Sequence, residues 1–106
     1  MFARIGTFDV APEKLVELLS HFQNHVVPAF SKHSGFLGYQ AFTDQERGRF
    51  VGISLWNTRF ELEASAVTAK QALHMASEIG SVAAGEPQIL EMAFDSSSKN
   101  LGARDA

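Results

Sequence analysis

Four histidines are the side chains of this sequence that exchange protons most readily near neutral pH. His21 and His25 are four residues apart, a spacing that puts both on one side of a helix. Two such histidines can belong to a metal site, but a third ligand and supporting hydrogen bonds are also needed. His25 lies on the flank of an apolar stripe and His21 further toward solvent. We therefore expect a boundary and an exposed histidine rather than a metal site.

The other candidates for proton transfer are His33, His74 and Tyr39. His33 comes just before a predicted strand and could reach the mouth of a pocket beneath that strand. His74 is expected to be exposed, because Lys70 and Glu78 are its neighbours at helical spacing. Tyr39 is a candidate proton donor, although its position in the strand predicts that it faces away from such a pocket. Cysteine is absent, which excludes disulfides and thiolate chemistry.

The composition indicates one small globular domain. The chain has 106 residues, of which 45% are hydrophobic and 20% charged, as in ordinary folded domains. A formal net charge of −3 does not provide the basic surface that nucleic acids require. The N-terminus turns polar by Thr7 and Asp9, and no apolar run approaches a membrane span. We expect a cytoplasmic protein without nucleic-acid or membrane partners, with a polar, flexible tail over residues 96–106.

Apolar periodicity predicts an α+β domain of βαββαβ order with a four-stranded antiparallel sheet. The predicted strands cover residues 2–10, 36–42, 50–56 and 88–94. A first helix follows the first strand and is ended or kinked at Pro28. A second helix begins at Thr58, whose hydroxyl forms a capping box with Glu61. It runs to about Gly80, with a break near Ser65.

Side-chain parity divides the predicted sheet into two faces that are both too apolar for water. One face is aliphatic and includes Ile5, Tyr39, Ile53 and Leu55. Two helices can cover only one face of four strands, so the aliphatic face needs another cover. A second copy of the chain is the simplest source. The sequence therefore predicts a homodimer formed through this face.

The second face alternates small and aromatic residues. Its small residues are Gly6, Gly38, Gly52 and Ser54, and its aromatic residues are Phe8, Phe42, Phe50 and Trp56. Glycines within a strand often mark a close approach or a hollow, so this face predicts a pocket for a small aromatic molecule. Helix residues such as Phe22 could line that pocket or fill it, and both interpretations stay open. If the pocket exists, His25 or His33 is the candidate base.

The segment Gly35-Phe36-Leu37-Gly38-Tyr39, the following hairpin, and Val51-Gly52-Ile53-Ser54-Leu55-Trp56 before a capped helix resemble antibiotic-biosynthesis-monooxygenase-like (ABM) domains. The resemblance covers residues 2–94. It implies a ferredoxin-like domain over residues 1–95 and a dimeric α+β barrel. It also implies that Trp56 matches a pocket tryptophan of the quinone-forming members. Those members have Asn where this chain has Gly52, and Tyr where it has Leu62.

The resemblance implies a monooxygenase that acts on a small quinol- or polyketide-like aromatic substrate. The alternative is a non-catalytic, small-molecule-binding or stress-related dimer of the same fold. We expect no flavin, haem or metal, because the chain lacks a glycine-rich phosphate loop and a cluster of metal ligands. The haem-degrading members of this family need a tryptophan in the second helix. This chain has none there, so the resemblance disfavours haem degradation.

Overall fold

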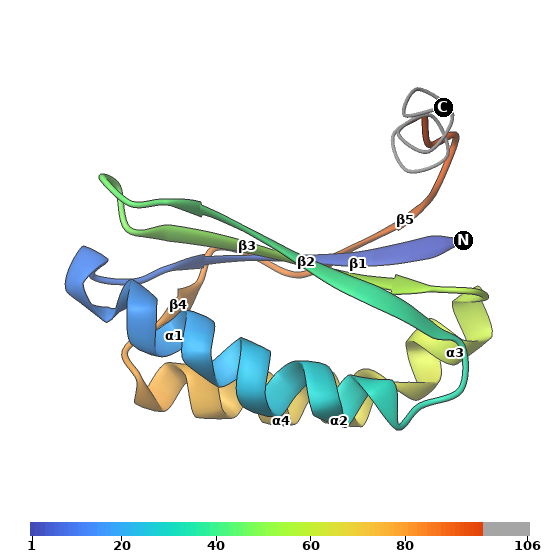
Figure 1. Cartoon of the computed structure of the whole chain (residues 1–106), viewed down its shortest axis with the longest axis horizontal. Helices are drawn as coiled ribbons and strands as arrows, with labels where there is room; N and C mark the ends of the chain where they lie inside the picture. Colours follow the sequence, from blue (N-terminus) through green and yellow to red (C-terminus); the bar gives the residue numbers. More distant parts are fainter. Residues whose placement is uncertain (97–106) are drawn as a thin grey trace, which may run out of the picture.

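The computed structural model describes residues 1–96 and has the predicted ferredoxin-like α+β fold, with helices lying along one face of a sheet (Figure 1). The strands are β1 Phe2–Asp9, β2 Phe36–Asp44, β3 Arg49–Trp56, β4 Val82–Ala83 and β5 Gln88–Glu91. The helical segments are η1 Pro12–Lys14, α1 Leu15–His21, η2 Phe22–Val26, α2 Val27–Ser31, α3 Arg59–Ala64 and α4 Ala66–Glu78. Beyond Ser96, the expected polar tail lies outside the described residues.

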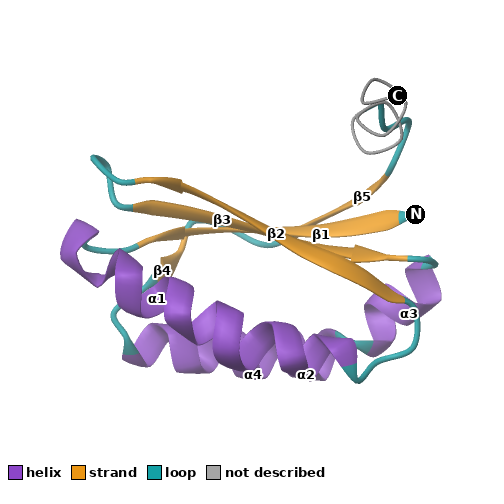
Figure 2. Ribbon diagram, in the orientation of Figure 1, coloured by secondary structure: helices purple, strands orange, loops and turns teal. Residues whose placement is uncertain are grey.

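The sheet has five strands rather than the predicted four, in the order β2-β3-β1-β4, with β5 also paired to β1. β4 pairs with the end of β1 at Phe8 and Asp9, and β5 pairs with its first half, from Phe2 to Ile5. Gly85 and Pro87 lie between β4 and β5 and separate these two short strands, which both pair with β1. Figure 2 shows the helical layer beneath one face of the sheet and the opposite face without helices.

The first helical segment continues past Pro28 instead of ending there. Its middle turn, η2, is a π-helix, in which the Val27 N–H bonds to the Phe22 carbonyl. In a regular α-helix the Pro28 ring would meet the carbonyl of the preceding turn and would lack a hydrogen bond. The wider π-helical turn just before Pro28 lets the chain pass this residue and continue as α2 to Ser31.

β2 contains a bulge that changes which side chains face the helices. The register shifts between Phe36 and Gly38, so Tyr39 pairs with Ser54 and Phe42 pairs with Val51. A bulge adds one residue to one strand and reverses the alternation beyond it. The predicted faces of Tyr39 and Phe42 are therefore wrong. Tyr39 faces the helices, and Phe42 lies on the open face with 57% of its surface exposed.

The core lies between the helix-facing side of the sheet and the helices. Its most completely buried large side chains include Trp56, Phe50, Leu15, Leu18 and Leu62. The predicted break near Ser65 and the capping box are both confirmed. The Glu61 backbone N–H donates to Thr58 Oγ1 at 3.1 Å, and the Thr58 hydroxyl donates to Glu61 Oε1 at 2.9 Å. These local contacts fix the start of α3 over the end of β3.

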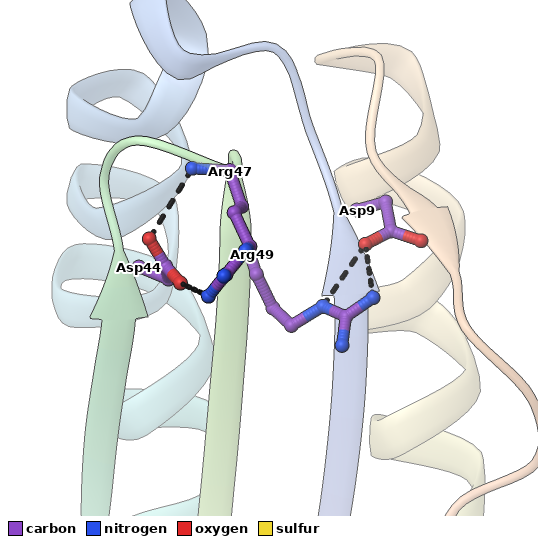
Figure 3. A network of polar contacts seen from close by, with 4 residues as sticks. All are labelled: Asp9, Asp44, Arg47 and Arg49. Carbon is purple, nitrogen blue, oxygen red and sulfur yellow. Dashed lines mark hydrogen bonds and ion pairs between the residues drawn. The ribbon is translucent and has the colours of Figure 1, made fainter.

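Two charged pairs lie at the hairpin end of the sheet (Figure 3). Arg49 of β3 bonds to Asp9 of β1 at 3.1 Å, and Arg47 bonds to Asp44 within the hairpin at 3.0 Å. Hydrogen bonds from Arg47 hold the pKa of Asp44 below its ordinary value. These pairs are exposed and lie outside the core. Within residues 1–96, no helix is long and apolar enough to cross a membrane.

Candidate functional site

A cavity of about 250 Å³ lies between the sheet and the helices. The sheet contributes Arg4, Gly6, Phe8, Tyr39, Gly52 and Ser54 to its lining. On the opposite side, α4 contributes mainly small residues, among them Ala66, Ala69 and Ala72, and Lys70 is its charged member. Small side chains on both layers leave this space unfilled, whereas tightly packed protein interiors have few such voids.

Several residues that the sequence predicted for a pocket do border this cavity. Phe8 and Phe22 are aromatic walls, and Gly6, Gly52 and Ser54 lie on the sheet side. The Phe22 side chain therefore lines the hollow without filling it. This favours the pocket interpretation of the small-and-aromatic face over the packed one.

Phe50 and Trp56 are part of the core behind the cavity and do not line it. Both side chains are fully buried. The Phe50 ring lies 4.7 Å from that of Phe22, measured between centroids. The Trp56 indole N–H donates to Ser54 Oγ at 2.9 Å, so it orients a hydroxyl that does border the cavity. These two aromatic residues thus support the lining from behind.

Tyr39 borders the cavity, contrary to its predicted place on the aliphatic face. Its ring stacks on Phe22, with centroids 5.9 Å apart and planes at 27°. A methyl group added at Gly52 would collide with the Tyr39 hydroxyl, so the missing side chain at Gly52 makes room for the phenol. The glycine that suggested an empty floor is therefore partly covered by tyrosine.

Burial raises the pKa of the Tyr39 hydroxyl above its ordinary value, so this group stays protonated near neutral pH. Within residues 1–96, no hydrogen bond engages this hydroxyl. It can therefore donate a hydrogen bond to a molecule in the cavity, whereas it is a poor base. Parity alone could not reveal this role, because the bulge in β2 decides the direction of the side chain.

Arg4 is the second polar group that sequence reasoning undervalued. Its guanidinium lies against the break between α3 and α4, and Arg4 lines the cavity. Nη1 donates to Ser65 Oγ at 3.0 Å, and Nη2 donates to the Leu62 carbonyl at 2.8 Å. Burial lowers the pKa of Arg4 from its ordinary value, although arginine stays charged in proteins. The sequence signal for this role is that Arg4 is a charged residue at a helix-facing position of a largely apolar strand.

Neither candidate base lines the cavity. His25 is exposed on η2, and the His33 ring is hydrogen-bonded to Thr68 Oγ1 of α4 at 2.7 Å. His33 also contacts the edge of Trp56, with ring centroids 6.2 Å apart. This histidine therefore ties the segment before β2 to α4. The assignment of His25 or His33 as a catalytic base stays a prediction.

His21 and His25 exchange their predicted environments. His21 has 7% of its surface exposed, and its Nε2 lies 3.4 Å from the Ala72 carbonyl, whereas His25 is exposed. His21 follows Leu18 by three residues and so shares its buried side of the helix. In the π-helical turn that follows, Val26 is buried and His25 is exposed. Among residues 1–96, no group of three His, Cys, Asp or Glu side chains could hold a metal ion.

This fold and cavity define a small α+β protein with a ligand-sized space between its sheet and its helices. The chain belongs to the antibiotic biosynthesis monooxygenase family, whose model matches residues 1–72. The resemblance that the strand motifs predicted is thereby confirmed.

Several solved structures share this fold. A protein of Deinococcus radiodurans superposes with a TM-score of 0.67 at 18% identity, covering 90% of this chain and 94% of its own. SnoaB, a cofactor-independent oxygenase of Streptomyces nogalater, gives 0.62 at 14% identity, covering 89% and 94%. The ActVA-Orf6 monooxygenase of Streptomyces coelicolor, in complex with Nanaomycin D, gives 0.62 at 19% identity, covering 89% and 87%. Comparison with curated protein sequences gives no significant match.

Proposed function

We propose that this protein is a cofactor-independent monooxygenase that oxidises a small quinol- or polyketide-like aromatic molecule. The observation that carries the proposal is the cavity of about 250 Å³, walled by Phe8 and Phe22 and supplied with few polar groups. Family membership supports the same assignment. SnoaB, which has a similar fold, is a cofactor-independent oxygenase, and the ActVA-Orf6 monooxygenase was crystallised with the ligand Nanaomycin D.

The substrate itself supplies the electrons in such a reaction. Loss of a proton gives an electron-rich anion, which transfers an electron to O₂, and the two radicals join at the ring carbon. For a ring CH₂ group, the carbon loses both hydrogens and gains one oxygen atom as a carbonyl. The second oxygen atom leaves as water with those two hydrogens. The balance needs neither an external reductant nor a bound cofactor.

The protein would contribute a dry, oriented site. Apolar walls exclude water from the reactive anion, which suppresses side reactions and strengthens electrostatic interactions. The Tyr39 hydroxyl is available as a hydrogen-bond donor to a substrate oxygen, because it stays protonated. Ser54, oriented by the Trp56 indole, is a second hydroxyl at the same wall.

The test uses a matched pair of substitutions on α4. Ala69 lines the cavity, whereas Val67 is 66% exposed and does not. Ala69→Phe should abolish catalysed oxygen uptake with anthrone or 1,4-dihydroxynaphthalene as substrate. Val67→Phe should retain the rate of the unsubstituted protein. The protein is dialysed against a chelator beforehand, and uptake in buffer alone is subtracted because these compounds autoxidise.

The alternative function is binding without turnover. It is favoured by the absence of any acidic or histidine side chain from the described cavity lining. Calorimetric binding of an aromatic probe that is lost in Ala69→Phe, with no oxygen uptake above buffer for any substrate, would assign a binding protein and overturn the oxygenase. Equal uptake by both variants would also contradict catalysis in this cavity.

We further propose that the chain works as a homodimer through its open sheet face. The supporting observation is that Ile5, Ile53 and Leu55 are only half-buried, and Phe42 beside them is exposed. This apolar face has no helical cover within residues 1–96 (Figure 2). Tyr39 is not part of the proposed contact, because it faces the cavity.

A further inference from the structure

Arg4 brings an incompletely used set of hydrogen-bond donors into the cavity. A guanidinium has five N–H donors. One hydrogen of Nη1 is used by Ser65 Oγ and one of Nη2 by the Leu62 carbonyl. Within residues 1–96, Nε and the second hydrogen of each Nη have no hydrogen-bond partner. The side chain is half-buried and lines the cavity, so these donors are available to a ligand.

The charge of Arg4 also lacks a carboxylate partner in the described part of the chain. The ion pairs there are Lys14–Glu17, Arg47–Asp44, Arg49–Asp9 and Arg59–Glu63. The described cavity lining includes no Asp or Glu, but it includes a second cation, Lys70. The Leu62 carbonyl lies near the end of α3, where the helix dipole offers only partial negative charge. A cation in an apolar surround is normally balanced by an anion.

We propose that Arg4 is the anion-binding group of the cavity, so that the preferred ligand is a planar aromatic molecule carrying an ionised oxygen, as in a phenolate, enolate or carboxylate. This inference rests on the proposed function only in taking the cavity as the binding site. Arginine suits the task because its planar donors match the geometry of charged oxygens. Ser65 and the Leu62 carbonyl bind one hydrogen each of Nη1 and Nη2. The remaining N–H donors of the guanidinium are available to the ligand.

An anion subsite would have a direct consequence for oxidation. Binding that favours the ionised form of a phenol or enol lowers the pKa of the bound molecule. The anion is the form that transfers an electron to O₂. Arg4 would therefore raise the reactive fraction of the substrate at neutral pH, without accepting a proton itself.

The experiment compares two planar probes that differ in charge, 2-naphthoate and 2-naphthamide, by isothermal titration calorimetry. The unsubstituted protein should bind naphthoate at least about tenfold more tightly, as expected for a charge-assisted hydrogen bond. Arg4→Gln should remove this preference and leave the affinity for naphthamide within about twofold. Arg59→Gln, which removes an exposed arginine paired with Glu63, is the control and should change neither affinity.

A second readout separates ligand binding from helix capping. Arg4→Lys keeps the charge and should retain part of the preference for naphthoate, whereas a merely structural arginine would give equal losses for both probes. If Arg4→Gln does not fold, the unsubstituted protein and Arg4→Lys decide. Equal affinities of the unsubstituted protein for the two probes, or a parallel loss of both in either variant, would overturn the inference. A charge preference without oxygen uptake would overturn only the proposed oxygenase.

Discussion

The two faces of the sheet are both apolar, yet only one is completed by the chain's own helices. In β3 the burial alternates strictly: Phe50, Gly52, Ser54 and Trp56 are buried, and Val51, Ile53 and Leu55 are half-exposed. The first set lies under the helical layer, and the second faces away from it (Figure 2). The two faces of the same strand therefore have different roles. One face builds a core with a site in it, and the other presents the surface proposed for assembly.

The helix-covered face is itself divided. Phe50 and Trp56 are fully buried and form packed parts of the core. Between them along the strand, Gly52 pairs with Gly6 of β1, and here the cavity opens. Aromatic residues thus stabilise the parts of the face that flank a pair of glycines. Stability and ligand binding should respond to different substitutions on this one face.

The largest effect is expected from removing a packed aromatic residue on the covered face. Phe50 is fully buried and contacts Phe22, so Phe50→Ala should lower the free energy of unfolding by about 3–5 kcal/mol. Val51 is its half-exposed neighbour on the open face, and Val51→Ala should cost about 1 kcal/mol. Urea denaturation followed by Trp56 fluorescence measures both. Similar losses for the two variants would contradict the proposed difference between the faces.

A charge on the open face should act on assembly more than on the fold. Ile53→Asp places an unpaired carboxylate in the proposed dimer contact and should raise the dimer dissociation constant at least about a hundredfold. Val16→Asp is the control, because Val16 is 73% exposed on α1. Sedimentation velocity at micromolar concentration should give dimer for the control and monomer or aggregate for Ile53→Asp. A stable, folded monomer of the unsubstituted protein would refute the homodimer.

Regular patterns predicted most of this architecture, and two local irregularities account for the main errors. Alternation and helical spacing identified four of the five strands, the two helical regions, the break at Ser65 and the small-and-aromatic face. Each irregularity shifts the register by one residue: the bulge after Phe36 in β2, and the π-helical turn before Val27. The bulge brought Tyr39 into the cavity, and the π-helical turn let the first helical segment continue past Pro28. Parity and periodicity assume an uninterrupted backbone, so they cannot locate such insertions.

The pair of glycines at the cavity allows a finer test of the covered face. Gly52→Ala would bring its methyl group against the Tyr39 hydroxyl, whereas at Gly6 an added methyl would lie 3.2 Å from the Phe8 ring. We expect Gly52→Ala to cost about 1–3 kcal/mol of stability and to weaken naphthoate binding, since Tyr39 must move. Gly6→Ala should cost less than Gly52→Ala. Combining Gly52→Ala with Tyr39→Phe should recover part of the stability, and a fully additive double variant would contradict the contact.

The smallest effect is expected from the ionisation of Tyr39, and it tests the burial of this side chain under the helices without changing any packing. A solvent-exposed tyrosine ionises near its ordinary pKa, whereas burial beside the cavity raises the pKa of Tyr39. The folded state then holds the tyrosine proton more tightly than the unfolded state does. This contribution to stability is complete below pH about 10, the ordinary value, and falls above it by up to about 1.4 kcal/mol for each further pH unit.

Because the sequence has a single tyrosine, its tyrosinate absorbance can be followed directly. The folded protein should ionise at higher pH than urea-unfolded protein, and Tyr39→Phe should lose the part of the alkaline destabilisation that is due to this group. Coincident titration of the folded and unfolded chains would place Tyr39 in solvent and remove it from the cavity wall.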